Sequence, residues 1–168
     1  MLWIDKIDKV FTKKNNSDNG TTQRITNMFL TWVSDKQKEV FIVATANKIN
    51  NLPTEMLRKG QFDEIFFVDL PDFKHRIEIF QIHLKNLRPL KWNRYNIYYL
   101  SKVSNGFSGA EIEEAISDAM YNSLYENREF TTSDIKNSIS KTVNFSRSNK
   151  ISLSKVRLWG YSGKIRAG

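Results

Sequence analysis

Two polar residues stand directly after apolar stretches that are typical of buried strands. Asp5 follows "LWI", and Asn47 follows "VATA". A strand that ends in an acidic residue places a carboxylate at the rim of its sheet, and open parallel sheets bind ligands just beyond the carboxyl ends of their strands. Lys6 stands directly after Asp5. Either polar residue alone also suits the start of a loop, and only together with the later stretch "LRKGQFDE" do they favour a site.

The first half of the chain alternates predicted strands and helices. Apolar, β-branched stretches predict buried strands at residues 1–5, 39–47 and 64–71. Apolar spacing and capping residues predict helices at residues 21–36, 51–60 and 72–87. A polar segment over residues 13–22 is typical of a loop. Strand–helix alternation predicts an α/β fold with a parallel sheet and helices on its faces.

Helical signals alone continue from residue 93. The clearest amphipathic helix covers residues 108–126, with an apolar stripe of Ile112, Ala115, Ile116, Ala119, Met120 and Leu124. Asp72 is the predicted cap of the helix at 72–87, whose apolar face is Ile77, Phe80, Ile82 and Leu84. We therefore expect a partial core over residues 1–86, a small all-helical part over 93–143, and a tail over 144–168.

The charge of the chain is concentrated near its end. From Phe130 onward there are eight Lys or Arg residues and one acidic residue, in a protein of 168 residues with a net charge of +8. A basic tail can bind nucleic acid or anionic lipid, but the charge is better explained by a solvated, mobile tail. There is no cysteine, which excludes disulfides and thiolate metal sites. No segment is long and apolar enough for a membrane span.

The order and spacing of these motifs resemble those of the AAA-type ATPases over nearly the whole chain. "LWIDKID" resembles the Walker B strand, and "VATANKINNLPTEMLRKGQFDEIFFVDLP" resembles the second region of homology. "GFSGAEI" is similar to the second-sensor turn of the helical lid. Other stretches, such as "REFTTSDI" and "WGYSGKIR", most resemble AAA proteins of cyanobacteria and algal plastids. The resemblance implies a partial P-loop NTPase core followed by a helical lid, located in the plastid stroma or in a cyanobacterial cytoplasm.

The resemblance also implies roles for individual residues. Asp5 would hold the Mg²⁺ of a bound ATP, and Asn47 would be the first sensor that orients the attacking water. Arg58 would be an arginine finger offered to the nucleotide of a neighbouring ring subunit. His83, Gly109 and Ala110 would lie near the adenine or ribose; for His83 alone, a histidine without a ligand role is the simpler interpretation.

The chain departs from the family pattern at three places. No G-x-x-x-x-G-K-[ST] motif occurs in the sequence, which predicts a C-terminal part of an AAA module that lacks its P-loop. Lys6 replaces the glutamate that polarises the attacking water, and an ammonium cannot accept that proton. Gln61 stands where a second arginine is usual and brings no charge. Without the strand that leads into the P-loop, we also expect an incomplete sheet.

Three functions remain open at this stage. The first is ATP binding and hydrolysis coupled to remodelling of an unknown partner, with the isolated chain inactive. The second is a non-catalytic, AAA-like module that interacts with ring subunits or another protein. The third, nucleic-acid binding through the tail, has only Trp159 and Tyr161 as interleaved aromatic residues, and packing of the tail explains them equally well.

Overall fold

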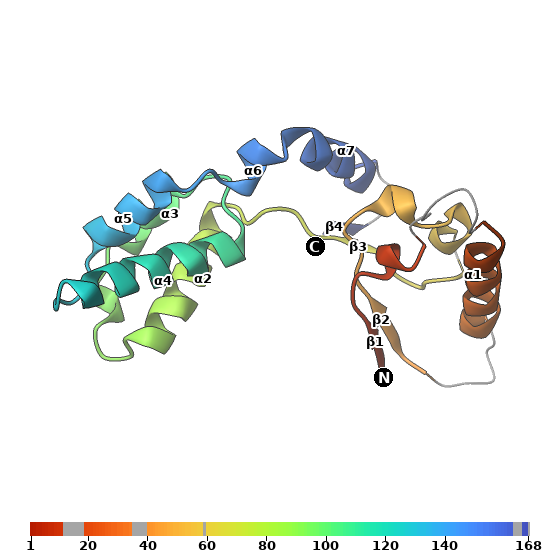
Figure 1. Ribbon diagram of the computed structural model, residues 1–168, viewed down its shortest axis with the longest axis horizontal. Coiled ribbons are helices and arrows are strands. Elements are labelled where there is room, and N and C mark those ends of the chain that lie inside the picture. The colour runs from red at the N-terminus through yellow and green to blue at the C-terminus, as the bar shows by residue number, and fades with distance from the viewer. Residues whose placement is uncertain (12–18, 35–39, 59, 163–165, 168) are drawn as a thin grey trace. The chain divides into compact units, whose positions relative to one another are not determined.

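The computed structural model describes residues 1–11, 19–34, 40–58, 60–162 and 166–167 (Figure 1). These residues form two compact units. The first consists of residues 1–67 and 158–168, and the second, the helical unit, consists of residues 68–157. The sequence-based division differs from this one, because it groups residues 68–86 with the core.

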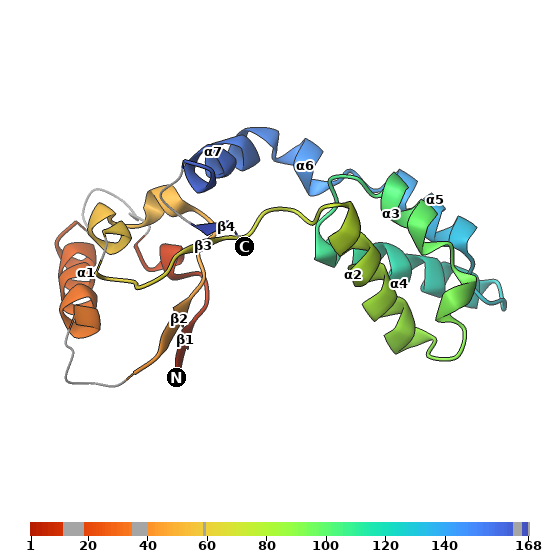
Figure 2. The same ribbon diagram turned by 180° about the vertical axis from the view of Figure 1, so that it is seen from behind.

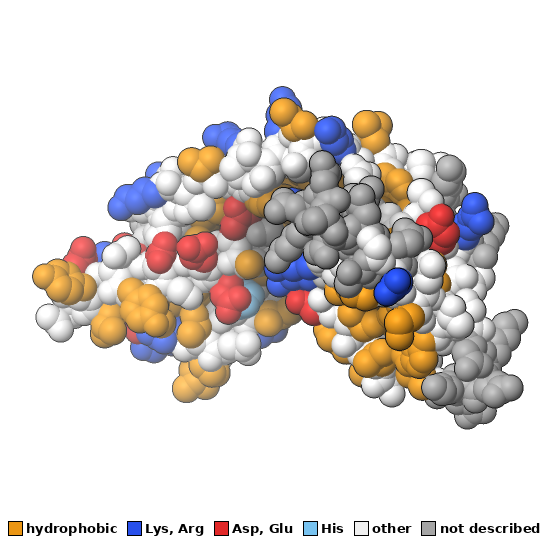
Figure 3. All heavy atoms as spheres, turned by 45° about the vertical axis from the view of Figure 1, so that its right-hand side comes forward, with side chains coloured by type: hydrophobic (Ala, Val, Ile, Leu, Met, Phe, Trp, Pro, Cys, Tyr) orange, Lys and Arg blue, Asp and Glu red, His pale blue; other side chains and the backbone are white. Residues whose placement is uncertain are grey.

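A short parallel sheet organises the first unit. Strand β1 (Leu2–Ile4) pairs with β2 (Ile42–Ala44), with Trp3 opposite Val43. Helix α1 (Asn19–Ser34) and three 3₁₀ helices complete this part: η1 (Ile7–Lys9), η2 (Ile49–Asn51) and η3 (Thr54–Leu57). The small core consists of Ile7, Phe11 and Met56, with Ile4, Phe29, Leu30, Ala44 and Leu52 packed against it. Hydrophobic side chains also gather on the exposed surface of this unit (Figure 3).

A second pair of strands lies in the same unit. Strand β3 (Phe66–Phe67) pairs in parallel with β4 (Arg166–Ala167). Within the described residues, β2 and β3 belong to different sheets, as expected for a sheet that lacks the strand between them. Gly160 lies so close to the Phe67 ring that a Cβ there would overlap it, and Tyr161 meets Phe67 edge-on at 5.3 Å between ring centroids. Tyr161 therefore packs against Phe67 on one side, while its side chain is 61% exposed.

The helical unit buries the larger core. Its helices are α2 (Phe73–Leu87), η4 (Trp92–Arg94), α3 (Ile97–Val103), α4 (Gly109–Tyr125), α5 (Thr132–Lys141), α6 (Phe145–Ser148) and the start of α7 (Lys150–Gly160). Helices α2 and α4 lie side by side, as Figures 1 and 2 both show. The fully buried side chains at its centre include Phe80, Leu84, Leu100, Ile112, Ile116 and Ile135.

Side-chain caps fix where these helices begin. Asp72 accepts a hydrogen bond from the His75 amide at 2.9 Å, which confirms the predicted cap of α2. Ser108 and Glu111 form a reciprocal capping box at the start of α4, and Thr131 and Asp134 form another at the start of α5. Together with the parallel pairing of β1 and β2, these helices confirm the α/β fold class and the helical nature of residues 93–143.

Several finer predictions are wrong. Helix α1 begins at Asn19, inside the expected loop of residues 13–22, of which residues 13–18 lie outside the described residues. Ile82 and Leu124 are 56% and 66% exposed, although their positions predicted core packing. The expected solvated tail instead contains α6, α7 and β4, and Arg157 pairs with Asp69 at 2.9 Å.

No helix among the described residues combines the length and apolar character needed to cross a bilayer.

Candidate functional site

The parallel pairing of β1 and β2 brings their carboxyl ends to one edge. Asp5 follows β1, and Thr45 follows β2. The Thr45 hydroxyl donates a hydrogen bond to Asp5 Oδ1 at 2.7 Å, and it accepts one from the Lys6 amide at 2.9 Å. Backbone bonds extend the ladder past both strands, from the Thr45 amide to the Ile4 carbonyl and from the Ile7 amide to the Thr45 carbonyl. We call Asp5, Lys6 and Thr45 the strand-end cluster.

Lys6 turns the chain sharply after β1. Its backbone lies in the left-handed region, with φ 53° and ψ 50°, which non-glycine residues seldom adopt. Its ammonium lies 3.3 Å from Asp5 Oδ2, and both side chains are about half exposed. The hydrogen bond from Thr45 lowers the pKa of Asp5 below its ordinary value, and Lys6 lowers it further. The carboxylate of Asp5 is thus held in its charged form.

A second carboxylate holds the backbone at Asn47. Asp8 is only 3% exposed, and its oxygens accept hydrogen bonds from the amides of Asn47 and Lys48 at 3.1 and 3.2 Å. The Asn47 side chain itself is exposed beyond this anchor. Sequence reasoning missed both Asp8 and Thr45. Their signal was weak: a second acid three residues after Asp5, and a hydroxyl just after an apolar strand.

Two further residues of the first unit that the sequence singled out, Arg58 and Gln61, follow η3. Arg58 is the residue at the C-terminal end of η3, where its amide donates to the Glu55 carbonyl, and its side chain is exposed. Gln61, the residue in place of a second arginine, accepts a hydrogen bond from the Ser34 hydroxyl at 3.1 Å. Gln61 therefore tethers this loop to α1.

Three predicted residues belong to the helical unit. His83 on α2 is about one quarter exposed, and its Nδ1 lies 3.8 Å from a carboxylate oxygen of Glu113 on α4. Gly109 and Ala110 are the first two residues of α4. A Cβ on Gly109 would lie 3.7 Å from Ile79, an ordinary contact, so packing against α2 does not require glycine there. The six predicted residues thus fall into two sets, one in each unit.

A divalent metal does not fit the strand-end cluster in this arrangement. Both oxygens of Asp5 are engaged, one by Thr45 and the other by Lys6. Asp8 uses its oxygens on backbone amides. The described part of the chain contains no group of three or more His, Cys, Asp or Glu residues that could hold a metal ion. The chemistry of the donor set therefore disagrees with the predicted metal role of Asp5.

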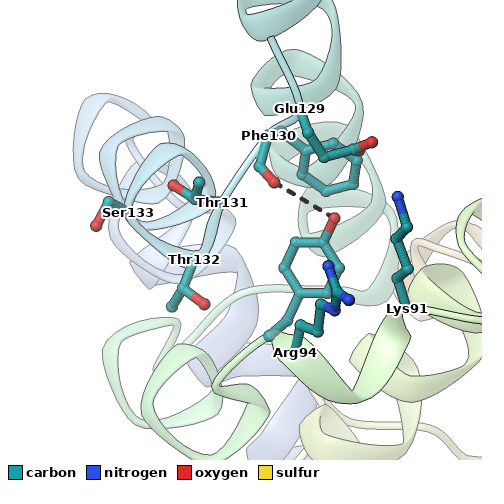
Figure 4. Close-up of a pocket in the computed structure, with 8 residues that line it drawn as sticks. Lys91, Arg94, Glu129, Phe130, Thr131, Thr132 and Ser133 are labelled. Carbon is teal, nitrogen blue, oxygen red and sulfur yellow. Dashed lines mark hydrogen bonds between the residues drawn. The ribbon is translucent and has the colours of Figure 1, made fainter.

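A separate pocket lies in the helical unit, with a cavity volume of about 330 Å³ (Figure 4). It is lined by Lys91, Arg94, Tyr95, Glu129, Phe130, Thr131, Thr132 and Ser133. The Tyr95 hydroxyl donates to the Phe130 carbonyl at 3.4 Å, and burial, with the Glu129 carboxylate, raises the pKa of Tyr95 to about 12. None of the six predicted site residues lines this pocket.

The chain is similar to known proteins along its whole length. Residues 1–70 match the ATPase family associated with various cellular activities (AAA). The chain is 54% identical over 167 residues to the "Uncharacterized AAA domain-containing protein ycf46" of Gracilaria tenuistipitata var. liui, covering 99% of this chain and 34% of that protein. It is 53% identical to the protein of the same name from Guillardia theta, with 99% of this chain and 33% of that protein covered.

A more distant relative has a more informative name. The chain is 32% identical over 163 residues to a proteasome-activating nucleotidase of Saccharolobus islandicus, which covers 94% of this chain and 41% of that protein. The chain spans about a third of the length of its AAA domain-containing relatives. The motifs of the strand edge agree with these similarities: residues 1–70 match the AAA family, and the whole chain is similar to AAA domain-containing proteins.

Proposed function

We propose that this chain contributes the strand-end edge and the helical lid of an ATP-binding AAA module. The observation that supports this most is the parallel pairing of β1 and β2, which brings Asp5, Thr45 and the anchored Asn47 to one edge. Open parallel sheets bind ligands beyond this edge. ATP is the ligand that similarity to the AAA family favours, and the phosphate-binding motif would have to come from polypeptide beyond these 168 residues.

Within this proposal, Asn47 orients water near the terminal phosphate, because an amide can donate to phosphate and accept from water at once. The exposed Arg58 offers its charge to the nucleotide of a neighbouring ring subunit. His83, Gly109 and Ala110 contact the adenine or ribose from the lid. Mg²⁺ normally accompanies ATP and neutralises phosphate charge, but no step is assigned to it at Asp5, since the donor set there does not fit.

Hydrolysis would be coupled to remodelling of an unknown partner protein. The Saccharolobus relative is, by its name, a nucleotidase that activates a proteasome. The plastid stroma is the proposed compartment, by similarity to the AAA proteins named above. A non-catalytic interaction module is the second candidate. Lys6 paired with Asp5, and Gln61 tied to Ser34, favour it, because neither residue can serve as base or second arginine.

A chimera tests the proposal. This chain would replace the matching third of the Gracilaria relative, and release of phosphate from ATP would be measured. We expect slow hydrolysis that Lys6→Glu accelerates, because a positioned general base contributes roughly 10²–10⁴-fold. Asn47→Ala should abolish the accelerated rate, whereas Lys48→Ala, at the neighbouring position that Asp8 also anchors, should not. Equal rates for all variants would favour the non-catalytic module.

A further inference from the structure

We propose that the ammonium of Lys6 balances the charge of Asp5 in place of a divalent cation, so that the strand-end cluster excludes such cations. This inference rests on the proposed function only in treating this edge as the one that faces the nucleotide. It assigns Lys6 a role of its own, beyond the mere loss of a catalytic base.

The polar groups of the strand-end cluster contact one another. The single hydroxyl proton of Thr45 is donated to Asp5 Oδ1, and the Thr45 oxygen accepts from the Lys6 amide. The other oxygen of Asp5 faces the Lys6 ammonium at 3.3 Å. Each oxygen of the Asp5 carboxylate therefore already has a partner within the cluster.

The backbone brings the lysine to this position. In an extended strand, successive side chains point to opposite faces, so the residue after Asp5 would point away from it. The left-handed conformation of Lys6 interrupts that alternation. As a result, both the amide and the ammonium of one residue serve the cluster.

A divalent cation would meet two obstacles here. Mg²⁺ requires oxygen ligands at about 2.0–2.1 Å in octahedral geometry, and an ammonium has no lone pair to offer. The next carboxylate along the chain, Asp8, is buried and bound to two amides, so it does not supply a second ligand. Repulsion between a divalent ion and an ammonium about 5 Å away corresponds to roughly a tenfold loss of affinity in water.

Paramagnetic broadening by Mn²⁺ tests the proposal on the full chain, without nucleotide. The amide signals of Asp5 and Thr45 would be followed during titration with Mn²⁺ alone. We expect Lys6→Gln to bind Mn²⁺ about tenfold more tightly than the unmodified chain, by the repulsion argued above. Lys6→Glu should bind more tightly still, and adding Asp5→Asn should remove the gain. Lys102→Gln is the charge-matched control, because it removes an equal charge from an exposed residue of the helical unit, outside the strand-end cluster, and should change little.

One outcome would overturn the proposal. If no Lys6 variant binds Mn²⁺ more tightly than the unmodified chain, whether all of them bind it or none does, Lys6 is not what excludes the ion. Because no nucleotide is present, the result is independent of whether the chimera binds or hydrolyses ATP, and the two proposals can fail separately.

Discussion

Replacement of Asp8 by alanine should release the backbone that carries Asn47. The carboxylate is 3% exposed and accepts two backbone hydrogen bonds, from Asn47 and Lys48, at 3.1 and 3.2 Å. Hydrogen bonds to a charged group contribute about 1.5–3 kcal/mol each, and water can replace part of this at an exposed loop, so we expect a loss of about 2–4 kcal/mol in the free energy of unfolding. Asp8→Asn keeps one acceptor oxygen and should lose about half as much.

Two measurements on the full chain check this expectation. Urea denaturation gives the change in the free energy of unfolding, and hydrogen exchange reports the amides of Asn47 and Lys48 individually. Both amides should exchange faster in Asp8→Ala than in the unmodified chain, by more than global destabilisation explains. Asp5→Ala is the matched control, because that exposed carboxylate accepts no backbone amide in the described structure and should leave these two amides protected. Unchanged stability and unchanged exchange in Asp8→Ala would refute the anchoring role.

The other expected effects concern the helical unit. Gly106→Ala should destabilise the chain by about 1–3 kcal/mol in urea denaturation, because Gly106 has φ +79° and an added Cβ would collide with Ser146; an unaltered midpoint would show that this turn relaxes freely. Arg76→Met should lower the free energy of unfolding by about 2–3 kcal/mol, since the buried guanidinium donates to the carbonyls of Pro71 and Ser101 and methionine leaves them without this donor; a methionine variant as stable as the unmodified chain would contradict this. The Arg128 guanidinium holds the pKa of Asp134 well below its usual range. Their pairing therefore stabilises the folded state above about pH 3.9, the pKa of an aspartate in the unfolded chain. This stabilisation is lost as the pH falls from there through the lowered pKa of Asp134 in the folded state. Below about pH 4, the melting temperature should therefore change less with pH for Asp134→Asn than for the unmodified chain. Parallel curves of melting temperature against pH would exclude this linkage.

The helical unit was predictable because its signals are local. Capping residues such as Asp72 act within one turn, and the apolar stripe of α4 repeats with the period of a helix, so both are readable from sequence. The two errors have different causes. Ile82 lies two residues from both Phe80 and Leu84, which is not helical spacing, and it is exposed on α2. Leu124 lies in the last turn of α4, where its exposure shows that the core it was expected to join has ended.

The strand edge was only partly predictable because its contacts are long-range. The sequence identifies Asp5 as a strand-end carboxylate, but the bond from Thr45 joins residues 40 positions apart, and it depends on the register of β1 against β2. Likewise, the pairing of β4 with β3 joins two-residue strands that are too short to leave a periodic pattern. The left-handed turn at Lys6 had no signal, since lysine rarely adopts it.

Calorimetric titration with Mg-ATP tests the central claim most directly. The chain alone should show no binding in the low micromolar range, because its 168 residues contain no phosphate-binding motif. The chimera, in which this chain replaces the matching third of the Gracilaria relative, should bind ATP with one site per chain. Tight, stoichiometric binding by the chain alone, or a chimera that fails to bind ATP although the unaltered Gracilaria relative binds it, would contradict the claim that this chain forms one side of an ATP site.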